Sequence, residues 1–454
     1  MSLPKVLIIG QPFTNNSGGG ITQANLFRGW DKDKIAVVCT IHMFNNLNPD
    51  ICRNYYILGN EEYKWTFPFN FLQRSVLSGG VIINPVTVNN AGEKVKSRIS
   101  LRERIVNNYF YPFLEYIGII HSISKIVLSD KLRNWIREYN PDVIYAQAST
   151  RETVLFCTWM HAFIKKPMVF HMMDDWPSTI SEKGPFQHFW RNKIDRAFRD
   201  LLDKSSALLS ISDFMADEYE ARYGKKFITF HNPIDLSFWR SHQRKDYLLS
   251  NNPTLLYAGR IGPGVQSSLE SAAKAMELVN RETGQSIRFV LQTEYKPAWV
   301  DKYPSTVHKS LVPYNELPKV FAEADFLLLP YDFSEASVKF IKYSMPTKAP
   351  EYMMSGTPVI VYAPEVTALV KDAQKNKWAK IVTVDNPAML SIALRELVNN
   401  EAERRQVSQT AIALSEEKYN AEKVRSRFRE VISSLVDVQS RKLNIEYLST
   451  QNLK

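Results

Sequence analysis

Ten short runs of apolar residues recur along the chain, and longer amphipathic segments separate them. Each run is continuously apolar rather than alternating, and many are rich in Val, Ile and Leu. Such runs are typical of strands that are buried on both faces of a parallel sheet with helical crossovers. The pattern therefore predicts an α/β protein of repeated β–α units, with strands over residues 6–9, 35–39, 143–145, 168–172, 207–211, 255–258, 289–291, 326–329, 359–362 and 381–384.

A polar stretch, residues 239–253, separates the first five runs from the last five and follows the turn-forming pair Asn232-Pro233. Domain boundaries fall in such segments, so we expect one here. Further helices are predicted over residues 266–279, 315–324, 349–355 and 421–436. We expect Asn315 to be the N-cap of the second of these helices and Gly356 to close the third.

The composition is that of a folded protein: 454 residues, of which 44% are hydrophobic and 23% charged. Lys and Arg number 57 against 47 Asp and Glu, and the resulting charge of +10 favours anionic partners, whether phosphates, nucleic acid or an acidic membrane face. Cys39, Cys52 and Cys157 are far apart, which disfavours a zinc knuckle or a disulfide framework and indicates a reducing cytosol. The start of the chain lacks the pattern of a secretory signal, and no apolar stretch has the length of a membrane span. We therefore expect a cytoplasmic protein that is soluble or peripheral.

One segment, residues 94–135, interleaves basic residues with aromatic ones. It allows two interpretations: a surface that lies on an anionic membrane, or two ordinary helices with packed aromatics and solvated cations. The basic residues are Lys94, Lys96, Arg98, Arg102, Arg104, Lys125, Lys131 and Arg133, and the aromatic ones are Tyr109, Phe110, Tyr111, Phe113 and Tyr116.

Glycines between the first strand and the following helix are the first candidate site. Gly18, Gly19 and Gly20 precede a stretch that opens like a helix at Ile21. Backbone N–H groups there could approach a phosphate or a sugar, although a purely structural loop is the alternative. The dinucleotide-binding fingerprint is not met, because Gln23 occupies its third glycine position, and no nicotinamide cofactor is expected.

The second half carries a more specific set of residues. Gly259 and Arg260 follow a strand, where a permanently charged guanidinium could bind a pyrophosphate. Further on, Lys348 lies beside a predicted helix start and Glu351 falls in its first turn. The carboxylate could accept both hydroxyls of a ribose and the ammonium could meet a phosphate, so one helix start would hold both ends of a nucleoside diphosphate.

With these residues the second half resembles the nucleotide-sugar-binding domain of the GT-B glycosyltransferases in the retaining family called glycosyl transferases group 1, or family 4. The resemblance spans most of the chain, and its most specific block is PTKAPEYMMSGTPVIVYAP. Other landmarks are Ser210-Ile-Ser-Asp213, Asn232-Pro-Ile-Asp235, Asn315-Glu-Leu-Pro and Ala324-Asp325.

Two features depart from the family pattern. The first glutamate of the usual Glu-x7-Glu would fall at Tyr343, and the lysine that often follows the Gly-Arg strand is missing. The chain resembles a subset of this family. That resemblance implies that Lys348 supplies the missing cation and that the backbone near Ser344 contacts the sugar.

In the first half, the strand over residues 168–172 leads to Asp174 and Asp175, and Asp174 stands where the family usually has a histidine. A carboxylate there could orient the acceptor hydroxyl or accept its proton, and His171 could contact the acceptor. The alternatives are a helix cap for the two aspartates and a packed strand histidine for His171. A metal site at the two aspartates is disfavoured, because GT-B enzymes use Arg, Lys and helix ends to stabilise the diphosphate.

We therefore expect two Rossmann-like domains that face each other across a cleft. Residues 1–245 would bind the acceptor, residues 246–415 the nucleotide sugar, and 416–454 would form a C-terminal helix that returns to the first domain, and a tail. The resemblance implies transfer of a sugar from a nucleoside diphosphate sugar to an acceptor hydroxyl with retention, without a metal or other cofactor. We expect the reaction to serve cell-surface polysaccharide or glycolipid synthesis at the inner membrane face. A nucleotide-sugar epimerase and a non-catalytic sugar-nucleotide-binding protein are the alternatives. Nucleic acid is not an expected partner, because it would not account for Arg260, Lys348 and Glu351.

Overall fold

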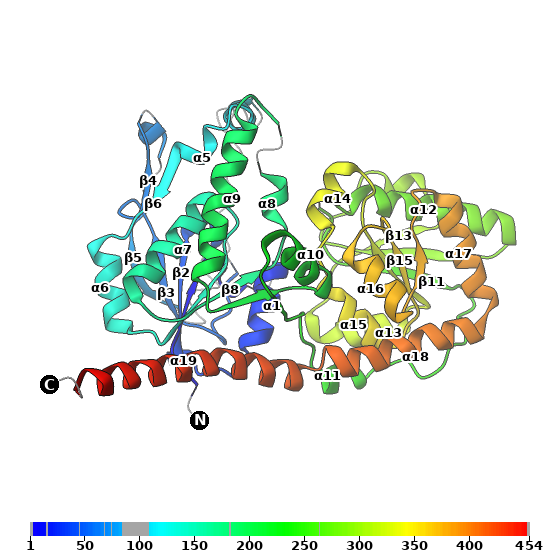
Figure 1. Cartoon of the computed structure of the whole chain (residues 1–454). Helices are drawn as coiled ribbons and strands as arrows, with labels where there is room; N and C mark the ends of the chain where they lie inside the picture. Colours follow the sequence, from blue (N-terminus) through cyan, green and yellow to red (C-terminus); the bar gives the residue numbers. More distant parts are fainter. Residues whose placement is uncertain are drawn as a thin grey trace. The chain divides into compact units, whose positions relative to one another are not determined.

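The structure is a computed structural model that describes residues 3–14, 17–44, 46–67, 69–73, 75–83, 109–180, 183–262 and 264–451 (Figure 1). The chain divides into two compact units. Unit 1 consists of Met1–Phe230 and Arg425–Lys454, and unit 2 of His231–Val424. Each unit is built around its own mainly parallel sheet.

Unit 1 contains an eight-stranded sheet with the order β10-β9-β8-β7-β1-β2-β3-β5. All neighbouring strands are parallel except β3 and β5. The strands are β1 (Val6–Ile9), β2 (Ile35–Thr40), β3 (Asn54–Leu58), β5 (Gly79–Ile82), β7 (Val143–Ala146), β8 (Met168–Met172), β9 (Ala207–Ser210) and β10 (Ile228–Thr229). A separate antiparallel ribbon joins β4 (Tyr63–Trp65) to β6 (Ser124–Ile126).

The helices of unit 1 connect these strands. They are α1 (Gly18–Phe27), α4 (Tyr111–Tyr116), α5 (Ile120–Ile123), α6 (Asp130–Tyr139), α7 (Arg151–Ile164), α8 (Trp176–Thr179), α9 (Gln187–Lys204) and α10 (Asp213–Tyr223), with 3-10 turns η1 (Lys32–Lys34), η2 (Ile41–Met43) and η3 (Phe69–Leu72).

Unit 2 contains a six-stranded, fully parallel sheet with the order β13-β12-β11-β14-β15-β16. This is the strand order of a Rossmann fold. The strands are β11 (Thr254–Ala258), β12 (Arg288–Gln292), β13 (Thr306–Lys309), β14 (Phe326–Pro330), β15 (Val359–Tyr362) and β16 (Lys380–Val382). The helices are α11 (Leu236–Arg240), α12 (Gln266–Thr283), α13 (Leu317–Glu323), α14 (Glu335–Ile341), α15 (Lys348–Ser355), α16 (Ala368–Asn376), α17 (Pro387–Asn399) and α18 (Glu401–Lys418), with 3-10 turns η5 (Val300–Lys302) and η6 (Tyr314–Glu316).

Successive residues of the central strands of unit 2 enter two different cores. Leu256 and Ala258 pack in one core with residues of α13 and α15, whereas Leu255 and Tyr257 pack in the other with residues of α12 and α17. Side chains alternate between the two faces of a strand, so continuous apolarity follows from cover on both faces. This arrangement confirms the interpretation of the apolar runs as buried parallel strands.

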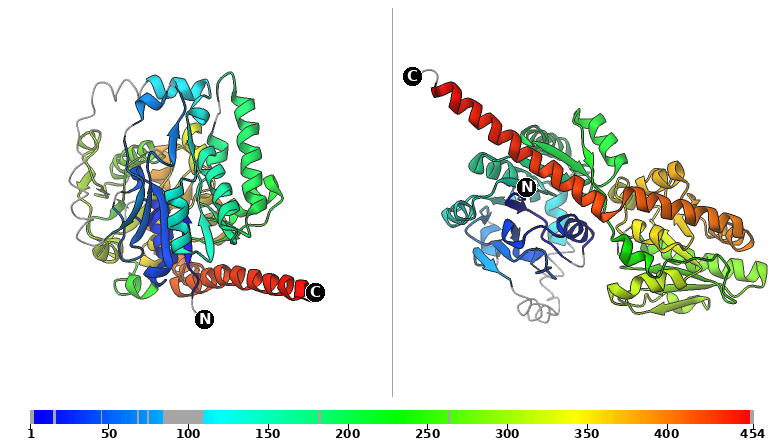
Figure 2. Two further views of the ribbon diagram at one scale, coloured as in Figure 1. Left: turned by 90° about the vertical axis from the view of Figure 1, so that its left-hand side faces the viewer. Right: turned by 90° about the horizontal axis from the view of Figure 1, so that it is seen from below.

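The last helix, α19 (Ala421–Gln451), is one continuous helix (Figure 2). From Arg425 onward it belongs to unit 1. The Phe428 ring packs edge-on against Phe27 and Phe230, with centroids 5.1 Å and 5.3 Å apart. The Arg425 side chain donates a hydrogen bond of 2.7 Å to the carbonyl of Asn25. The C-terminal helix therefore returns to the first domain, as predicted.

Residues 231–245 were assigned to the first domain from the sequence, but they lie in unit 2. Trp239 is fully buried and stacks on Phe321 of α13, with ring centroids 5.5 Å apart. This contact between residues 82 positions apart in the sequence has no local signal.

Candidate active site

The strand order of unit 2 reverses between β11 and β14. Ligands of open parallel sheets bind outside the carboxyl ends of the strands at such a point. Gly259 and Arg260 follow β11, and Tyr331 and Asp332 follow β14. The N–H of Asp332 donates a hydrogen bond of 2.7 Å to the carbonyl of Gly264, which holds the two loops together at this edge of the sheet.

Lys348 is the first residue of α15, and its side chain reaches the end of β11. Its ammonium lies 4.1 Å from the centroid of the Tyr257 ring. A cation over an aromatic ring at this distance is favourable by about 1 kcal/mol, and more where water is excluded. Two segments about ninety residues apart thus place a positive charge at the sheet edge, where the partial charge of the helix start is also positive.

Gly259 is adapted to this arrangement. Its φ is +150°, a conformation that side-chain-bearing residues rarely adopt. A Cβ atom on Gly259 would lie 2.1 Å from Nζ and 2.9 Å from Cε of Lys348. The absence of a side chain therefore makes room for the lysine.

Glu351 lies one turn into α15 and is only 7% exposed. Burial raises the pKa of Glu351 to about 7, and this increase outweighs the opposing effects of the Tyr314 hydroxyl and the nearby Lys348 charge. The Tyr314 hydroxyl donates a hydrogen bond of 3.2 Å to Glu351 Oε1. Helix α15 thus carries an ammonium group and a carboxyl group one turn apart.

Two further side chains hold the start of α15 in place. The Tyr352 hydroxyl accepts a hydrogen bond of 3.1 Å from the N–H of Ala258 in β11. The Asn232 side chain donates a hydrogen bond of 3.1 Å to the carbonyl of Thr347. Asn232, identified from the sequence only as a turn residue and family landmark, therefore positions the residue before Lys348.

The other predicted donor-site residues are Arg260, which follows β11, and Ser344, which precedes α15. Arg260 is exposed, and its carbonyl accepts a hydrogen bond of 2.6 Å from the Tyr257 hydroxyl. The N–H of Ser344 donates a hydrogen bond of 3.0 Å to the carbonyl of Ile341. Tyr343, at the position of the family's first glutamate, is buried, and the Lys342 ammonium lies 4.9 Å from its ring centroid.

In unit 1 the three glycines are not a loop before the helix. Helix α1 begins at Gly18 rather than at Ile21, so Gly18, Gly19 and Gly20 form its first turn. The Ser17 side chain caps the helix by accepting a hydrogen bond of 3.1 Å from the N–H of Gly20. A Cβ atom on Gly20 would lie 2.1 Å from the Thr14 hydroxyl, so this glycine is needed for a close approach.

A chain of hydrogen bonds links this helix to β8. Gln23 of α1 accepts a bond of 2.9 Å from the Gln147 side chain, which also donates to the Tyr145 hydroxyl at 3.4 Å. Tyr145 in turn forms a hydrogen bond with Nδ1 of His171. Gln23 itself donates to the carbonyl of Gln11 at 2.9 Å. No sequence pattern predicted this chain of hydrogen bonds, because its members come from four separate segments.

His171 is only 1% exposed. Burial lowers the pKa of His171 to about 3, against a smaller opposing effect of a hydrogen bond to the Ser210 backbone, so the ring is uncharged at neutral pH. Its edge-on packing against Tyr145, with centroids 5.9 Å apart, agrees with the packed-histidine alternative.

The two aspartates after β8 differ in environment. Asp174 is exposed. Asp175 is 2% exposed and forms a two-pronged ion pair with Arg222, with distances of 3.0 Å and 3.1 Å. It also accepts a hydrogen bond of 2.6 Å from the Tyr219 hydroxyl. Asp175 occupies the N-cap position of α8, but its side chain makes no capping hydrogen bond.

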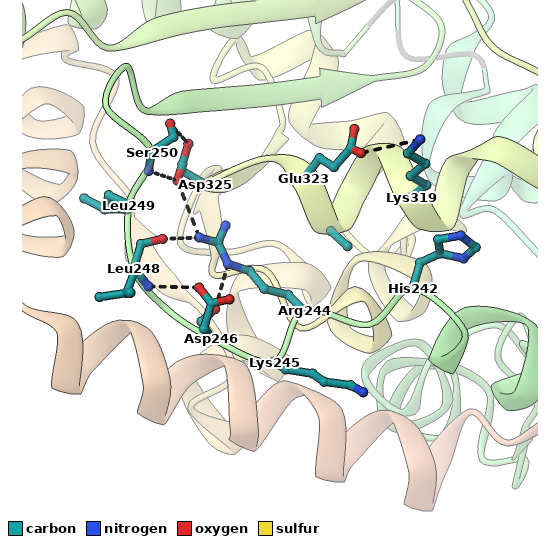
Figure 3. A pocket seen from close by; sticks show the side chains of 11 residues that line it. His242, Arg244, Lys245, Asp246, Leu248, Leu249, Ser250, Lys319, Glu323 and Asp325 are labelled. Atoms are coloured by element: carbon teal, nitrogen blue, oxygen red, sulfur yellow. Dashed lines mark hydrogen bonds and ion pairs between the residues drawn. The ribbon is translucent and has the colours of Figure 1, made fainter.

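A separate pocket of about 480 Å³ lies on unit 2 and contains none of the predicted site residues (Figure 3). The side chains of Arg244 and Asp325 meet at its wall, and Asp325 accepts hydrogen bonds of 3.0 Å and 2.9 Å from the N–H groups of Ser250 and Thr254. The Arg244 guanidinium also donates to the carbonyls of Ala324 and Leu248. These contacts fasten the polar segment before β11, so the pocket is accounted for by structural roles.

Within the described ranges, no group of three or more His, Cys, Asp or Glu side chains is placed to hold a metal ion. None of the helices described there is both long enough and apolar enough to cross a membrane. The three cysteines are buried, and burial raises the pKa of Cys39, Cys52 and Cys157 to about 12.

Two Rossmann-like units in one chain are the architecture of the GT-B class of glycosyltransferases. Residues 94–238 match the family described as Glycosyltransferase Family 4, and residues 252–400 match Glycosyl transferases group 1. The two segments together cover more than half of the sequence, and the chain belongs to the glycosyl transferases group 1. No curated protein matches it in sequence.

Solved structures share the fold at low sequence identity. The sucrose-phosphate synthase of Thermosynechococcus elongatus has a TM-score of 0.61 and 12% identity, over 96% of this chain and 100% of that chain. Anabaena HepE, solved with UDP and glucose, has a TM-score of 0.56 and 11% identity, over 95% of this chain and 100% of that chain. The α,α-trehalose 6-phosphate synthase of Burkholderia multivorans has a TM-score of 0.58 and 10% identity, over 97% and 98%.

Proposed function

We propose that this glycosyltransferase moves a sugar from a nucleoside diphosphate sugar to an acceptor hydroxyl, with retention of the anomeric configuration. The observation that carries the proposal is the pair Lys348 and Glu351 at the start of α15, beside the point where the strand order of unit 2 reverses. The ammonium would bind the diphosphate and the carboxylate the two ribose hydroxyls.

Charge on the diphosphate grows as the bond to the sugar breaks. Lys348 and the exposed guanidinium of Arg260 would stabilise this charge, and backbone near Ser344 would contact the sugar. The Lys348 ammonium is already fixed over Tyr257, in the space that Gly259 leaves. The site therefore needs little rearrangement to stabilise the charge during the reaction. No metal or other cofactor enters this proposal.

Unit 1 would bind the acceptor. Asp174 is exposed at the end of β8 and would orient the acceptor hydroxyl or accept its proton. His171 is buried and neutral, so it would not contact the acceptor. Its role would be to position the end of β8 through its hydrogen bond with Tyr145. The first turn of α1, with Gly18, Gly19 and Gly20, would face a phosphate or the acceptor.

The acceptor would be lipid-linked or a growing polysaccharide at the inner face of the membrane. The charge of +10 supports an anionic surface as a partner. The basic residues Lys94, Lys96, Arg98, Arg102 and Arg104 of the segment first expected to make this contact lie outside the described residues.

The experiment that tests the reaction is incubation of the protein with a UDP-sugar, then with GDP-, ADP- and dTDP-sugars, with and without a lipid-linked acceptor. UDP-sugars come first because Anabaena HepE was solved with UDP-glucose. The proposal predicts release of the nucleoside diphosphate that depends on the acceptor. A new sugar nucleotide formed without acceptor would indicate an epimerase instead, and binding without any turnover would indicate a non-catalytic protein.

A further inference from the structure

Large aromatic side chains are exposed on one part of unit 1. Phe67 is 79% exposed, Phe71 is 78% exposed and Tyr109 is 73% exposed. We define the aromatic surface as these three residues together with Phe113, Tyr116, Phe186 and Phe189, each of which is more than half exposed.

The segments that carry these residues are in contact. The N–H of Thr66, after β4, donates a hydrogen bond of 2.7 Å to the carbonyl of Ile123 in α5. His121 lies against Trp190 of α9, with ring centroids 5.3 Å apart, and Phe189 lies against the same Trp190 at 5.1 Å. Figure 1 shows β4, α5 and the beginning of α9 at one end of unit 1, and the part of α19 that belongs to the unit lies at the other end. The exposed rings therefore belong to one surface.

Two lysines on the ribbon beside this surface form an unfavourable pair. Lys64 of β4 and Lys125 of β6 are directly opposite each other in the antiparallel register, and both are exposed. Like charges at opposed positions of a strand pair destabilise it. In the part of the chain that the structure describes, no carboxylate lies within ion-pair distance of either lysine. An anion bound at the ribbon would remove the repulsion.

More cations lie at the edge of the aromatic surface. The Lys193 ammonium lies 5.1 Å from the Phe189 ring centroid, and Lys183 and Arg191 are exposed nearby in the sequence. Glu115 is the acidic residue of α4. Exposed aromatic rings combined with an excess of cations suit the boundary between anionic headgroups and acyl chains, where the rings enter the apolar layer and the ammonium groups stay among the phosphates.

We propose that the aromatic surface, with Lys64 and Lys125, docks unit 1 on an anionic lipid bilayer. This deepens the proposed function, because it rests on an acceptor presented at a membrane and names the face of the acceptor-binding unit that meets it. An exposed group of aromatic rings with cations nearby fits a lipid surface better than a small ligand, which binds in an enclosed pocket.

Sedimentation of the full chain with lipid vesicles tests the proposal. Wild type is expected to bind vesicles of phosphatidylcholine mixed with phosphatidylglycerol, to bind phosphatidylcholine vesicles at least about tenfold more weakly, and to be released by high salt. The double variants Phe67→Ser/Phe71→Ser and Lys64→Glu/Lys125→Glu should each lose about tenfold or more in binding to the anionic vesicles. Leu248→Ser is the matched control, because Leu248 is 68% exposed but lies in unit 2.

Thermal unfolding and donor binding are measured on the same samples, so that loss of the fold or of the donor site is recognised separately. Equal binding by wild type and both double variants, equal binding to the two kinds of vesicle, or no binding at all would overturn the proposal. Vesicle binding by a protein that binds no nucleotide sugar would leave the docking surface intact and reject the proposed function. Donor binding without vesicle binding would do the reverse.

Discussion

The ammonium of Lys348 lies 4.1 Å from the centroid of the Tyr257 ring, and this contact joins the start of α15 to the end of β11. The lysine needs the space that Gly259 leaves free. The geometry gives the cation a fixed position beside the point where the strand order reverses, whereas a lysine on an exposed helix would keep its rotamer freedom.

The Lys348→Met variant keeps most of the side-chain volume but removes the charge. We expect kcat to fall by about 10²- to 10³-fold while donor affinity changes less, because the charge on the diphosphate is greatest in the transition state. Steady-state kinetics and calorimetry measure the two effects. Lys319→Met is the control, because Lys319 forms an exposed ion pair with Glu323. Arg260→Ala should follow the pattern of Lys348→Met, and unchanged turnover in either variant would assign that residue a structural role.

Gly259→Ala tests the role of the empty space. The new Cβ would lie 2.1 Å from Lys348 Nζ, so the lysine must move away from Tyr257, and we expect a loss of turnover similar in size to that of Lys348→Met. Gly262 is the control from the same loop, since a Cβ there meets nothing within 4 Å. Gly262→Ala should therefore retain activity, and equal loss in the two variants would show that the loop as a whole, rather than the lysine position, is sensitive.

Glu351 should make donor binding depend on pH. The burial that raises the pKa of Glu351 to about 7 leaves the carboxyl protonated at pH 5, and only the ionised form offers each ribose hydroxyl a charged acceptor oxygen of its own. Affinity for the nucleotide sugar should therefore decrease by about 100-fold from pH 8 to pH 5, and Glu351→Gln should remove most of this dependence. Calorimetry at several pH values measures it, and a pH dependence of the same size in Glu351→Gln would contradict the assignment.

The Glu351 carboxyl should also make protein stability depend on pH, but with the opposite sign: donor affinity increases with pH, whereas the contribution to stability decreases. A raised pKa in the folded state means that the folded protein holds the proton more tightly, so the contribution of this carboxyl to stability is greatest below its ordinary pKa of 4.5 and is lost as the pH rises to about 7. The shift corresponds to a loss of about 3 kcal/mol. We compare the free energy of unfolding of Glu351→Gln with that of wild type by chemical unfolding at pH 5 and at pH 8. The difference should favour the variant more at pH 8 than at pH 5.

The Asp175→Asn variant tests whether Asp175 has a structural or a catalytic role in unit 1. Its carboxylate is occupied by Arg222 and Tyr219, so Asp175→Asn should lower the free energy of unfolding by about 3 kcal/mol. Asp195→Asn is the control, because Asp195 pairs with Arg199 on the surface, and this change should cost less than about 1 kcal/mol. A stable Asp175→Asn protein without activity would instead support catalysis by this residue.

The sequence predicted the central strands well because their apolar runs are long enough to identify. Each of the ten predicted runs overlaps a strand, and Gly356, with φ of +78°, ends α15 as expected. The strands that were missed lie toward the edges of the sheets. Among them, β13 (Thr306–Lys309) has the sequence TVHK and β10 (Ile228–Thr229) has two residues, and neither carries a continuous apolar signal.

Capping was predicted less well. Asn315 was expected to cap a helix, but it lies inside the 3-10 turn η6, and Glu316 is the N-cap residue of α13. The helix over 421–436 was predicted too short, since α19 extends to Gln451. Helix ends depend on backbone partners that a residue pattern does not reveal.

The residues of the candidate site were likewise predicted where they lie close together in the sequence and missed where they lie far apart. The local block around Lys348 and Glu351 was visible in the sequence, because both lie in one helix turn. Tyr314, which donates to Glu351 from 37 positions away, was not, and neither was the hydrogen-bond chain from Gln23 to His171. Such contacts depend on which strand ends the fold brings together. The spacing of residues along the sequence does not show which segments will become neighbours.

The most direct test of the central claim is the thermal unfolding of wild type and Glu351→Ala with UDP-, GDP-, ADP- and dTDP-linked sugars. A ligand at about 100 times its dissociation constant stabilises the folded protein by about 2.7 kcal/mol, which is readily measured as a rise in Tm. We predict that at least one nucleotide sugar raises the Tm of wild type and that the rise is lost or greatly reduced in Glu351→Ala, because each hydrogen bond to the carboxylate contributes about 1.5 to 3 kcal/mol. No stabilisation of wild type by any of the four, or equal stabilisation of both proteins, would contradict a nucleotide-sugar site at the start of α15.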